Sequence, residues 1–200
     1  MSAAIDFYFE FSSPYGYFAA ERIEALAQRH GRTVDWHPLL LGVIFKSTGV
    51  LPLTQVPLKR DYVKRDWERI SRLTGIPFNM PSVFPIASHN PARAVLFVAR
   101  SNEQAAKDLT LALYRAYYVD GQNIGEAEVV CSVAQGLGLD AAAIAEGMAD
   151  PAVKEQLKHE VGAAEARGVF GSPFVIVDGE PSWGFDRFDM LEAWLERGGF

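Results

Sequence analysis

The sequence predicts an α/β fold in which a small sheet is interrupted by a large block of helices. Strand-like alternation is confined to the two ends of the chain, in residues 5–11 and 33–38 at the start and residues 174–183 near the finish. Between them, residues 39–168 carry helical spacing and no strand pattern. A chain of 200 residues forms one large domain or one domain with an insertion, and strands found only near the ends favour the insertion.

The opening stretch, IDFYFEFSSPYGYF at residues 5–18, predicts a strand that runs directly into a helix. Apolar side chains alternate with more polar ones, among them Asp6 and Glu10, which is the period of a β-strand. Ser13 then offers an oxygen that can cap a helix, and Pro14 suits a first helical turn, where its missing N–H costs nothing. The sequence therefore predicts a hydroxyl group at the N-terminus of the first helix.

Two features of this stretch leave alternatives open. Free N–H groups and the positive end of the helix dipole meet beside Ser13, so an anion would be stabilised there, although an ordinary helix cap is the simpler interpretation. Asp6 and Glu10 lie in a strand that a sheet of this type covers on both faces. They must therefore have buried partners or sit at the ends of the strand.

The remaining elements follow from spacing and turn residues. Residues 33–38 predict a second strand, and strand, helix, strand in succession favours a parallel pair. Asp178 and Gly179 form the strongest short hairpin signal, and Pro181 suits an edge strand. Helices are predicted over residues 14–30, 43–46 (or a turn), 61–74, 92–100, 105–118, 126–136, 141–148, 153–167 and 188–195.

These elements together predict a thioredoxin-like sheet with a large all-helical insertion, one of several topologies that the pattern permits. Residues 1–38 and 169–200 would form the thioredoxin-like domain, and residues 39–168 the inserted helical domain.

The composition excludes several classes of function. A net charge of −6 without long basic runs argues against a nucleic-acid partner. No apolar stretch approaches the roughly 20 residues of a membrane span. The first strand starts too early for a signal peptide, so we expect no membrane partner and a cytoplasmic protein. Cys131 is the single cysteine, which excludes an intrachain disulfide, a CxxC redox pair and a cysteine zinc cluster, and we expect a buried, inert thiol and no metal site.

Two further features have simple structural interpretations. Lys46 lies in an apolar segment broken by glycine and proline, where a surface lysine with its stem on apolar groups is the simpler interpretation. Tyr114, Tyr117 and Tyr118 cluster near the end of one predicted helix, and we expect core rings with hydroxyl groups that reach solvent.

Four segments occur along the chain in this order: FYFEFSSPYGYFA, LLGVIFKSTG, GVFGSPFVIVDGE and WGFDR. Together they resemble the 2-hydroxychromene-2-carboxylate isomerase family, which is close to the kappa-class glutathione transferases within the DsbA-like branch of the thioredoxin superfamily. The resemblance covers essentially the whole chain. It implies a DsbA/kappa-type fold, glutathione as cofactor, a small aromatic substrate and a homodimer.

The resemblance also implies roles for single residues. Ser13-Pro14 stands where oxidoreductases of the superfamily have Cys-Pro, and Gly16 takes the place of their second cysteine. The Ser13 hydroxyl would hydrogen-bond the sulfur of glutathione and favour its thiolate. Ser172-Pro173 matches a cis-proline turn, whose outward backbone groups would pair with the cysteinyl backbone of glutathione like an added strand.

Trp183, Asp186 and Arg187 match the last of the four segments and are implied to bind glutathione. The Asp186 carboxylate would hold the γ-glutamyl ammonium, a role compatible with capping the last helix. Lys46 matches a lysine implied to meet the carboxylate of the substrate.

The leading hypothesis is therefore a glutathione-dependent isomerase of hydroxychromene carboxylates, with Ser13 as the catalytic residue. A kappa-like transferase or peroxide-reducing enzyme is the alternative among enzymes, and it would consume glutathione. A non-catalytic glutathione- or peptide-binding module is the alternative outside enzymes. The single cysteine rules out a disulfide oxidoreductase.

Overall fold

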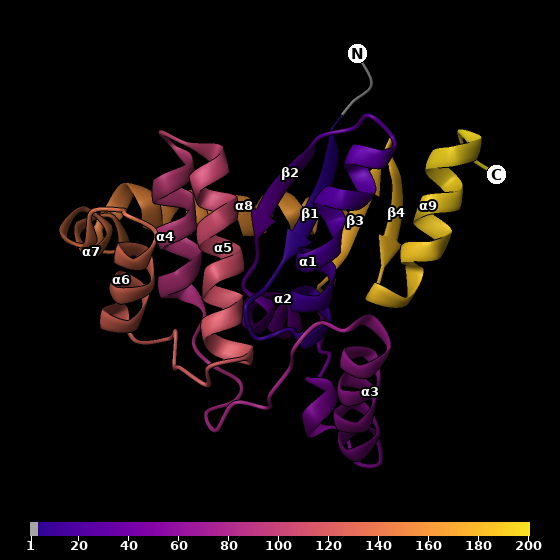
Figure 1. Ribbon diagram of the computed structural model, residues 1–200, viewed down its shortest axis with the longest axis horizontal. Coiled ribbons are helices and arrows are strands. Elements are labelled where there is room, and N and C mark those ends of the chain that lie inside the picture. Colours follow the sequence, from indigo (N-terminus) through magenta and orange to yellow (C-terminus); the bar gives the residue numbers. More distant parts are fainter. Residues whose placement is uncertain (1–3) are drawn as a thin grey trace.

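A four-stranded sheet joins the two ends of the chain in the computed structural model, which describes residues 4–200 (Figure 1). Its order is β2–β1–β3–β4, from β1 (Ile5–Phe9), β2 (Val34–Pro38), β3 (Phe174–Val177) and β4 (Glu180–Trp183). β1 pairs in parallel with β2 and antiparallel with β3, which pairs antiparallel with β4. The predicted parallel opening and the C-terminal hairpin are confirmed.

The strands bury both faces of the sheet because successive side chains point to opposite sides. Phe7 lies in the main core together with apolar side chains of α1 (Pro14–Arg29). Tyr8 lies in a second core cluster with apolar side chains of α8 (Pro151–Ala166), which passes behind the sheet in Figure 1. Two helices far apart in sequence therefore cover the two faces.

The chain between β2 and β3 is helical, as predicted, and a last helix follows β4. The helices of this block other than α8 are α2 (Leu41–Thr48), the 3₁₀ turn η1 (Leu53–Gln55), α3 (Lys59–Thr74), α4 (His89–Ala99), α5 (Glu103–Tyr118), α6 (Ala127–Gly136) and α7 (Ala141–Ala149). After β4 come the 3₁₀ turn η2 (Phe185–Arg187) and α9 (Phe188–Arg197). The domain boundaries placed after residues 38 and 168 stay a prediction.

Helix starts differ from the sequence prediction where a proline stands near them. α4 begins at His89, three residues before the predicted start, and holds Pro91 within its first turn. A proline is tolerated there because its missing N–H has no partner within the helix. α2 is a full helix of eight residues that ends at Gly49 in the left-handed conformation, so the alternative of a turn is wrong.

The tyrosine cluster of α5 forms part of the core, but its hydroxyl groups do not reach solvent as expected. Tyr114, Tyr117 and Tyr118 are all fully buried. Their hydroxyl groups donate to backbone carbonyls of Glu10, Val83 and Phe11 at 2.8–3.0 Å. A buried hydroxyl needs an acceptor, and these three find it in two loops that no helical periodicity could reveal.

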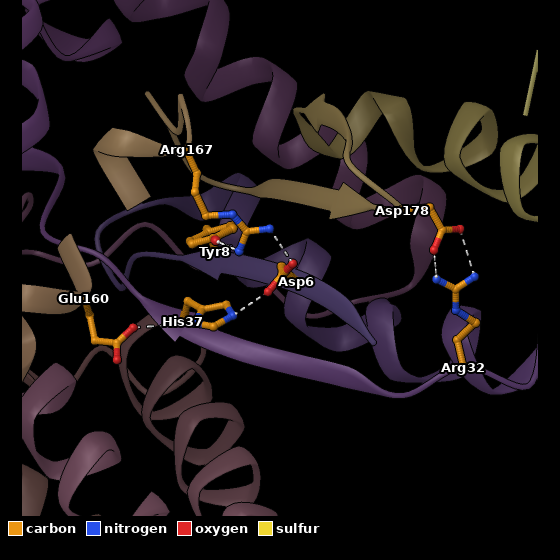
Figure 2. Close-up of polar contacts among 7 residues, drawn as sticks. All are labelled: Asp6, Tyr8, Arg32, His37, Glu160, Arg167 and Asp178. Carbon is orange, nitrogen blue, oxygen red and sulfur yellow. Dashed lines mark hydrogen bonds and ion pairs between the residues drawn. The ribbon is translucent and has the colours of Figure 1, made fainter. Parts of the chain in front are cut away.

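Asp6 has polar partners in a cluster on the α8 side of the sheet (Figure 2). Asp6 accepts a hydrogen bond from Arg167 at 2.8 Å and faces Nε2 of His37 at 3.0 Å. The other ring nitrogen of His37 lies 3.6 Å from the Glu160 carboxylate, and Arg167 also donates to the Tyr8 hydroxyl. Asp6 thus has charged partners, and the cluster ties α8 to both parallel strands.

This cluster makes stability depend on pH. Burial disfavours the charged imidazolium, but hydrogen bonds to Glu160 and Asp6 outweigh it and raise the pKa of His37 above its ordinary value of 6.5. The stabilisation is therefore complete below pH 6.5 and is lost as pH rises through the raised value. We expect urea unfolding to show this alkaline loss in the wild-type protein and not in His37→Gln, and parallel pH curves for the two proteins would contradict it.

The hairpin and the lone cysteine complete the comparison with the sequence. Asp178 and Gly179 both have positive φ, 52° and 90°, as a two-residue type I′ turn requires. Asp178 also pairs with Arg32 at 2.7 Å, away from the cluster around Asp6 (Figure 2).

Cys131 is only partly buried, so the expectation of a buried thiol is wrong, and burial together with the Glu128 carboxylate raises the pKa of this thiol. No helix within residues 4–200 is long and apolar enough to cross a lipid bilayer.

Candidate functional site

Ser13 sits where β1 gives way to α1, with an extended backbone that turns its side chain onto the first helical turn. Its Oγ accepts the N–H of Gly16 at 3.1 Å and donates to the carbonyl of Ser172 at 2.8 Å. The predicted helix cap is therefore present, and it joins two segments that are 159 residues apart in sequence. The one hydroxyl proton of Ser13 points toward the turn that precedes β3.

The loop that carries Ser13 is fixed from several sides. The carbonyl of Glu10 accepts both the N–H of Ser13 and the hydroxyl of Tyr114, each at 2.9 Å. The Ser12 hydroxyl donates to the carbonyl of Ile86 at 3.1 Å and accepts the Ile86 N–H at 3.2 Å. α5 and the loop before α4 thus hold the start of α1 in place, which pre-organises Ser13.

Glu10 is the second acidic residue of the opening stretch, for which buried partners or a place at the end of the strand were the two alternatives. It follows the last residue of β1, is 2% exposed, and accepts the Ser12 N–H at 2.7 Å. Burial raises the pKa of its carboxyl to about 7, against the opposing effect of hydrogen bonds from Ser88 and from the Ser12 N–H. Glu10 therefore lies at the end of its strand and has buried partners, but within residues 4–200 none of those partners is a cation.

The Ser172–Pro173 peptide bond is cis, as the resemblance implies. The carbonyl of Ser172 accepts a hydrogen bond from the Ser13 hydroxyl, whereas the N–H of Ser172 has no hydrogen-bond partner in the part of the chain that the structure describes. The hydroxyl of Ser172 is also buried without a partner there. Buried polar groups are normally satisfied, so this turn has capacity to bind a polar ligand.

Gly16 stands against the same turn. A methyl group placed on it would lie 2.9 Å from both the Ser172 hydroxyl and the Tyr114 hydroxyl. Any larger side chain would push one of these groups away, so the packing requires glycine here. The resemblance places the second cysteine of disulfide oxidoreductases at this position, and glycine offers no thiol there.

Trp183 closes one side of the turn. It ends β4 opposite Phe174, is 52% exposed, and stacks edge-on against Phe170 at 5.0 Å between ring centroids. Its indole lies so close to Gly171 that a side chain at that position would overlap it. The indole is thus held upright beside the Ser172–Pro173 turn with half of its surface free.

Asp186 and Arg187 follow Trp183 in the turn η2. The Asp186 carboxylate folds back over Gly184, whose φ of 107° and missing side chain leave room for it. Both side chains are exposed, and they pair with each other at 3.5 Å. Gly184 in turn donates its N–H to the carbonyl of Pro173 at 3.0 Å, which connects η2 to the turn before β3.

The structure brings Ser13 together with the Ser172–Pro173 turn. Trp183 contacts this turn at Gly171, and Asp186 and Arg187 are connected to it through Gly184. Lys46 is not part of this arrangement. It lies exposed on α2, at the end of the sheet where β1 and β2 finish and α1 begins, and no contact links it to another predicted site residue (Figure 1). No group of three metal-ligating side chains is found among residues 4–200.

Comparisons with known proteins show the family of the chain. The family model of the DSBA-like thioredoxin domain matches residues 4–196. The 2-hydroxychromene-2-carboxylate isomerase of Sphingobium xenophagum is 31% identical over 201 residues, which cover 98% of this chain and 99% of that one. This chain belongs to the 2-hydroxychromene-2-carboxylate isomerase family.

The fold of this isomerase-family protein agrees with that assignment. A solved 2-hydroxychromene-2-carboxylate isomerase superimposes with a TM-score of 0.89 at 28% identity, covering 97% of this chain and 95% of the other. Glutathione S-transferase kappa 1 of Rattus norvegicus is more distant, at 23% identity over 96% of this chain and 92% of its own. The predicted thioredoxin-like fold with a helical insertion is confirmed, and the kappa-class proteins are its wider relatives.

Sequence reasoning missed several polar residues that support Ser13. Glu10 was noticed only as an acid in an apolar strand, and that misfit was the one available signal of its burial. Ser12 and Ser88 carry no recognisable sequence signal. The hydroxyl of Ser12 contacts Ile86, which is 74 residues away, and Ser88 contacts the carboxyl of Glu10. The Tyr114 hydroxyl was assigned to solvent, where no contact with the loop of Ser13 was expected.

Proposed function

We propose that this family member is a glutathione-dependent isomerase that converts hydroxychromene carboxylates to trans-o-hydroxybenzylidenepyruvate products. The observation that carries the proposal is the Ser13 hydroxyl at the N-terminus of α1, beside a turn with an unpartnered N–H and an unpartnered hydroxyl at Ser172. When bound, glutathione would supply a thiolate nucleophile for reversible addition to the electrophilic carbon of the substrate, and it would be released unchanged. We further propose that the protein is a cytoplasmic homodimer.

Ser13 would hold the thiolate. Its hydroxyl now donates to the Ser172 carbonyl, so a bound sulfur anion must take that proton contact over, while Gly16 continues to donate its N–H to Ser13. The free N–H groups of the first helical turn and the helix dipole add a positive potential at the same place. These groups lower the pKa of a thiol without any nearby cation, and Ser13 itself forms no covalent bond.

The turn before β3 would hold the middle of the glutathione molecule. The unpartnered N–H of Ser172 can donate to a peptide carbonyl, in the manner of an added strand. Trp183 lies beside this turn with about half of its surface exposed, so its indole would cover the ligand backbone there. These residues fit a short peptide with a thiol, which is the chemistry of glutathione.

Asp186 would receive the γ-glutamyl ammonium, with Arg187 steadying the carboxylate through their ion pair. We expect Asp186→Asn to weaken glutathione binding about tenfold, the loss of one charge-assisted hydrogen bond, while N-acetylglutathione binds both proteins equally. Isothermal titration calorimetry measures both ligands. Asp189→Asn, an exposed carboxylate on the first turn of α9, is the matched control and should bind glutathione normally. Equal glutathione affinity in Asp186→Asn would remove Asp186 from the site.

Lys46 would meet the carboxylate of the aromatic substrate. Its ammonium group is exposed on α2, which lies at the end of the sheet that carries Ser13, and a free ammonium suits a carboxylate.

Product analysis tests the function. We expect 2-hydroxychromene-2-carboxylate to isomerise only when glutathione is present, with the total thiol concentration unchanged at the end. Stoichiometric loss of thiol would instead favour the kappa-like transferase or peroxidase. Binding of glutathione without conversion of any electrophile would favour the non-catalytic binding module.

A further inference from the structure

We propose that Glu10 is a positioning residue for Ser13 and that the charge of its buried carboxylate opposes a thiolate held there. This inference rests on the proposed function, because it concerns glutathione at the same site. It comes from a buried acid that the role of Ser13 alone does not require.

The geometry places Glu10 where the start of α1, the start of α4 and α5 meet. Its backbone carbonyl receives Ser13 and Tyr114, and its carboxylate receives the Ser12 N–H at 2.7 Å and the Ser88 side chain. Ser88 directly precedes α4, so one side chain joins the start of α1 to the start of α4. Loss of the Glu10 carboxylate would remove the contact with the Ser12 N–H, directly beside Ser13, and the contact with Ser88.

The surroundings leave the charge of Glu10 uncompensated. The titratable groups that face it are Tyr114, Tyr117 and Tyr118 of α5. Burial raises the pKa of each of these phenols most, and the charge of Glu10 raises it further. Among residues 4–200 no lysine, arginine or histidine pairs with it. The carboxyl therefore changes charge near neutral pH and not in the acidic range usual for glutamate.

The Glu10 carboxylate accepts the N–H of Ser12, the residue next to Ser13, so its charge acts on a thiol held by Ser13 and the two groups titrate as a coupled pair. An ionised Glu10 opposes a thiolate at Ser13, and a thiolate at Ser13 opposes ionisation of Glu10. In the wild-type protein, thiolate formation is then accompanied by proton uptake on Glu10, which spreads the thiol titration over a wider pH range. The site gains thiolate without a second full negative charge.

Glu10→Gln separates the two roles, because an amide oxygen still accepts the Ser12 N–H and the amide group still reaches Ser88. We expect the ratio of thiolate to thiol of bound glutathione to rise at least about threefold at alkaline pH, where the removed charge opposed it, with little change below neutrality. The ultraviolet absorbance of the thiolate measures this ratio. Glu196→Gln removes an exposed charge on α9 and is the matched control, with no expected change.

Infrared absorption of the carboxyl group, taken as wild type minus Glu10→Gln without glutathione, should show a titration midpoint of about 7. Identical thiolate titrations in wild type and Glu10→Gln would overturn the inference and leave the proposed function standing. A wild-type protein that yields no thiolate signal would overturn the proposed function and the inference with it. If Glu10→Gln fails to fold, the wild-type protein is titrated with labelled glutamate carboxyl groups. The absence of any glutamate that titrates near neutrality overturns the inference, and one glutamate that titrates near neutrality supports it.

Discussion

Ser13→Ala should lower the rate of isomerisation by about 10²–10³-fold, the usual cost of removing one donor to a developing anion. The hydroxyl proton that now reaches the Ser172 carbonyl is the donor that the sulfur would take over at this helix start. Steady-state kinetics with 2-hydroxychromene-2-carboxylate should show the loss mainly in kcat, because the peptide part of glutathione keeps its contacts with the Ser172–Pro173 turn.

The same substitution removes a helix cap, which alone costs about 1 kcal/mol of stability. Asp140→Ala is a matched control, since Asp140 caps α7 by accepting the N–H groups of Ala142 and Ala143. We expect this variant to lose a similar amount of stability and to keep its activity. If both variants lost activity equally, the effect of Ser13→Ala would be one of folding and not of chemistry.

Gly147→Val should destabilise the protein by about 3 kcal/mol or more, the upper end of what overpacking costs in a core. Gly147 lies on α7 against the Phe97 ring of α4, and even a methyl group at this position would overlap ring carbons. The overlap begins at Cγ of Phe97, so the ring cannot swing clear without moving the whole side chain. Urea unfolding followed by circular dichroism measures the loss.

Gly162 supplies the control for this prediction. It lies within α8, and a methyl group there would meet nothing within 4 Å. Gly162→Ala should therefore stabilise the protein by up to about 1 kcal/mol, because alanine has the higher helix propensity. If Gly147→Val were as stable as the wild-type protein, α4 and α7 would not pack as the structure has them.

The elements that the sequence predicted well are those whose signals are local. The strand that leads into Ser13 was visible from alternation and cap residues, and the Asp178-Gly179 turn from residue types that accept positive φ. The start of α4 lies at His89 and not at the predicted residue 92, because the first turn of a helix accepts Pro91.

The candidate site was predictable only in part, for the same reason. Ser13 and Ser172 were predicted from motifs near opposite ends of the chain, and the structure places the Ser13 Oγ 2.8 Å from the Ser172 carbonyl oxygen. The supporting residues could not be found because their roles depend on contacts between distant segments. Glu10 is buried only because α4, α5 and the loop of Ser13 close around it, and no periodicity in residues 5–18 encodes that closure.

The central claim is that the start of α1 holds glutathione as a thiolate through Ser13. The most direct test is the ultraviolet absorbance of the thiolate while glutathione is titrated into the protein across a range of pH, repeated with Ser13→Ala. We predict a thiolate signal near neutral pH in the wild-type protein and its displacement to the range of free glutathione in the variant. The same curve in both proteins, or no thiolate signal in either, would contradict the account.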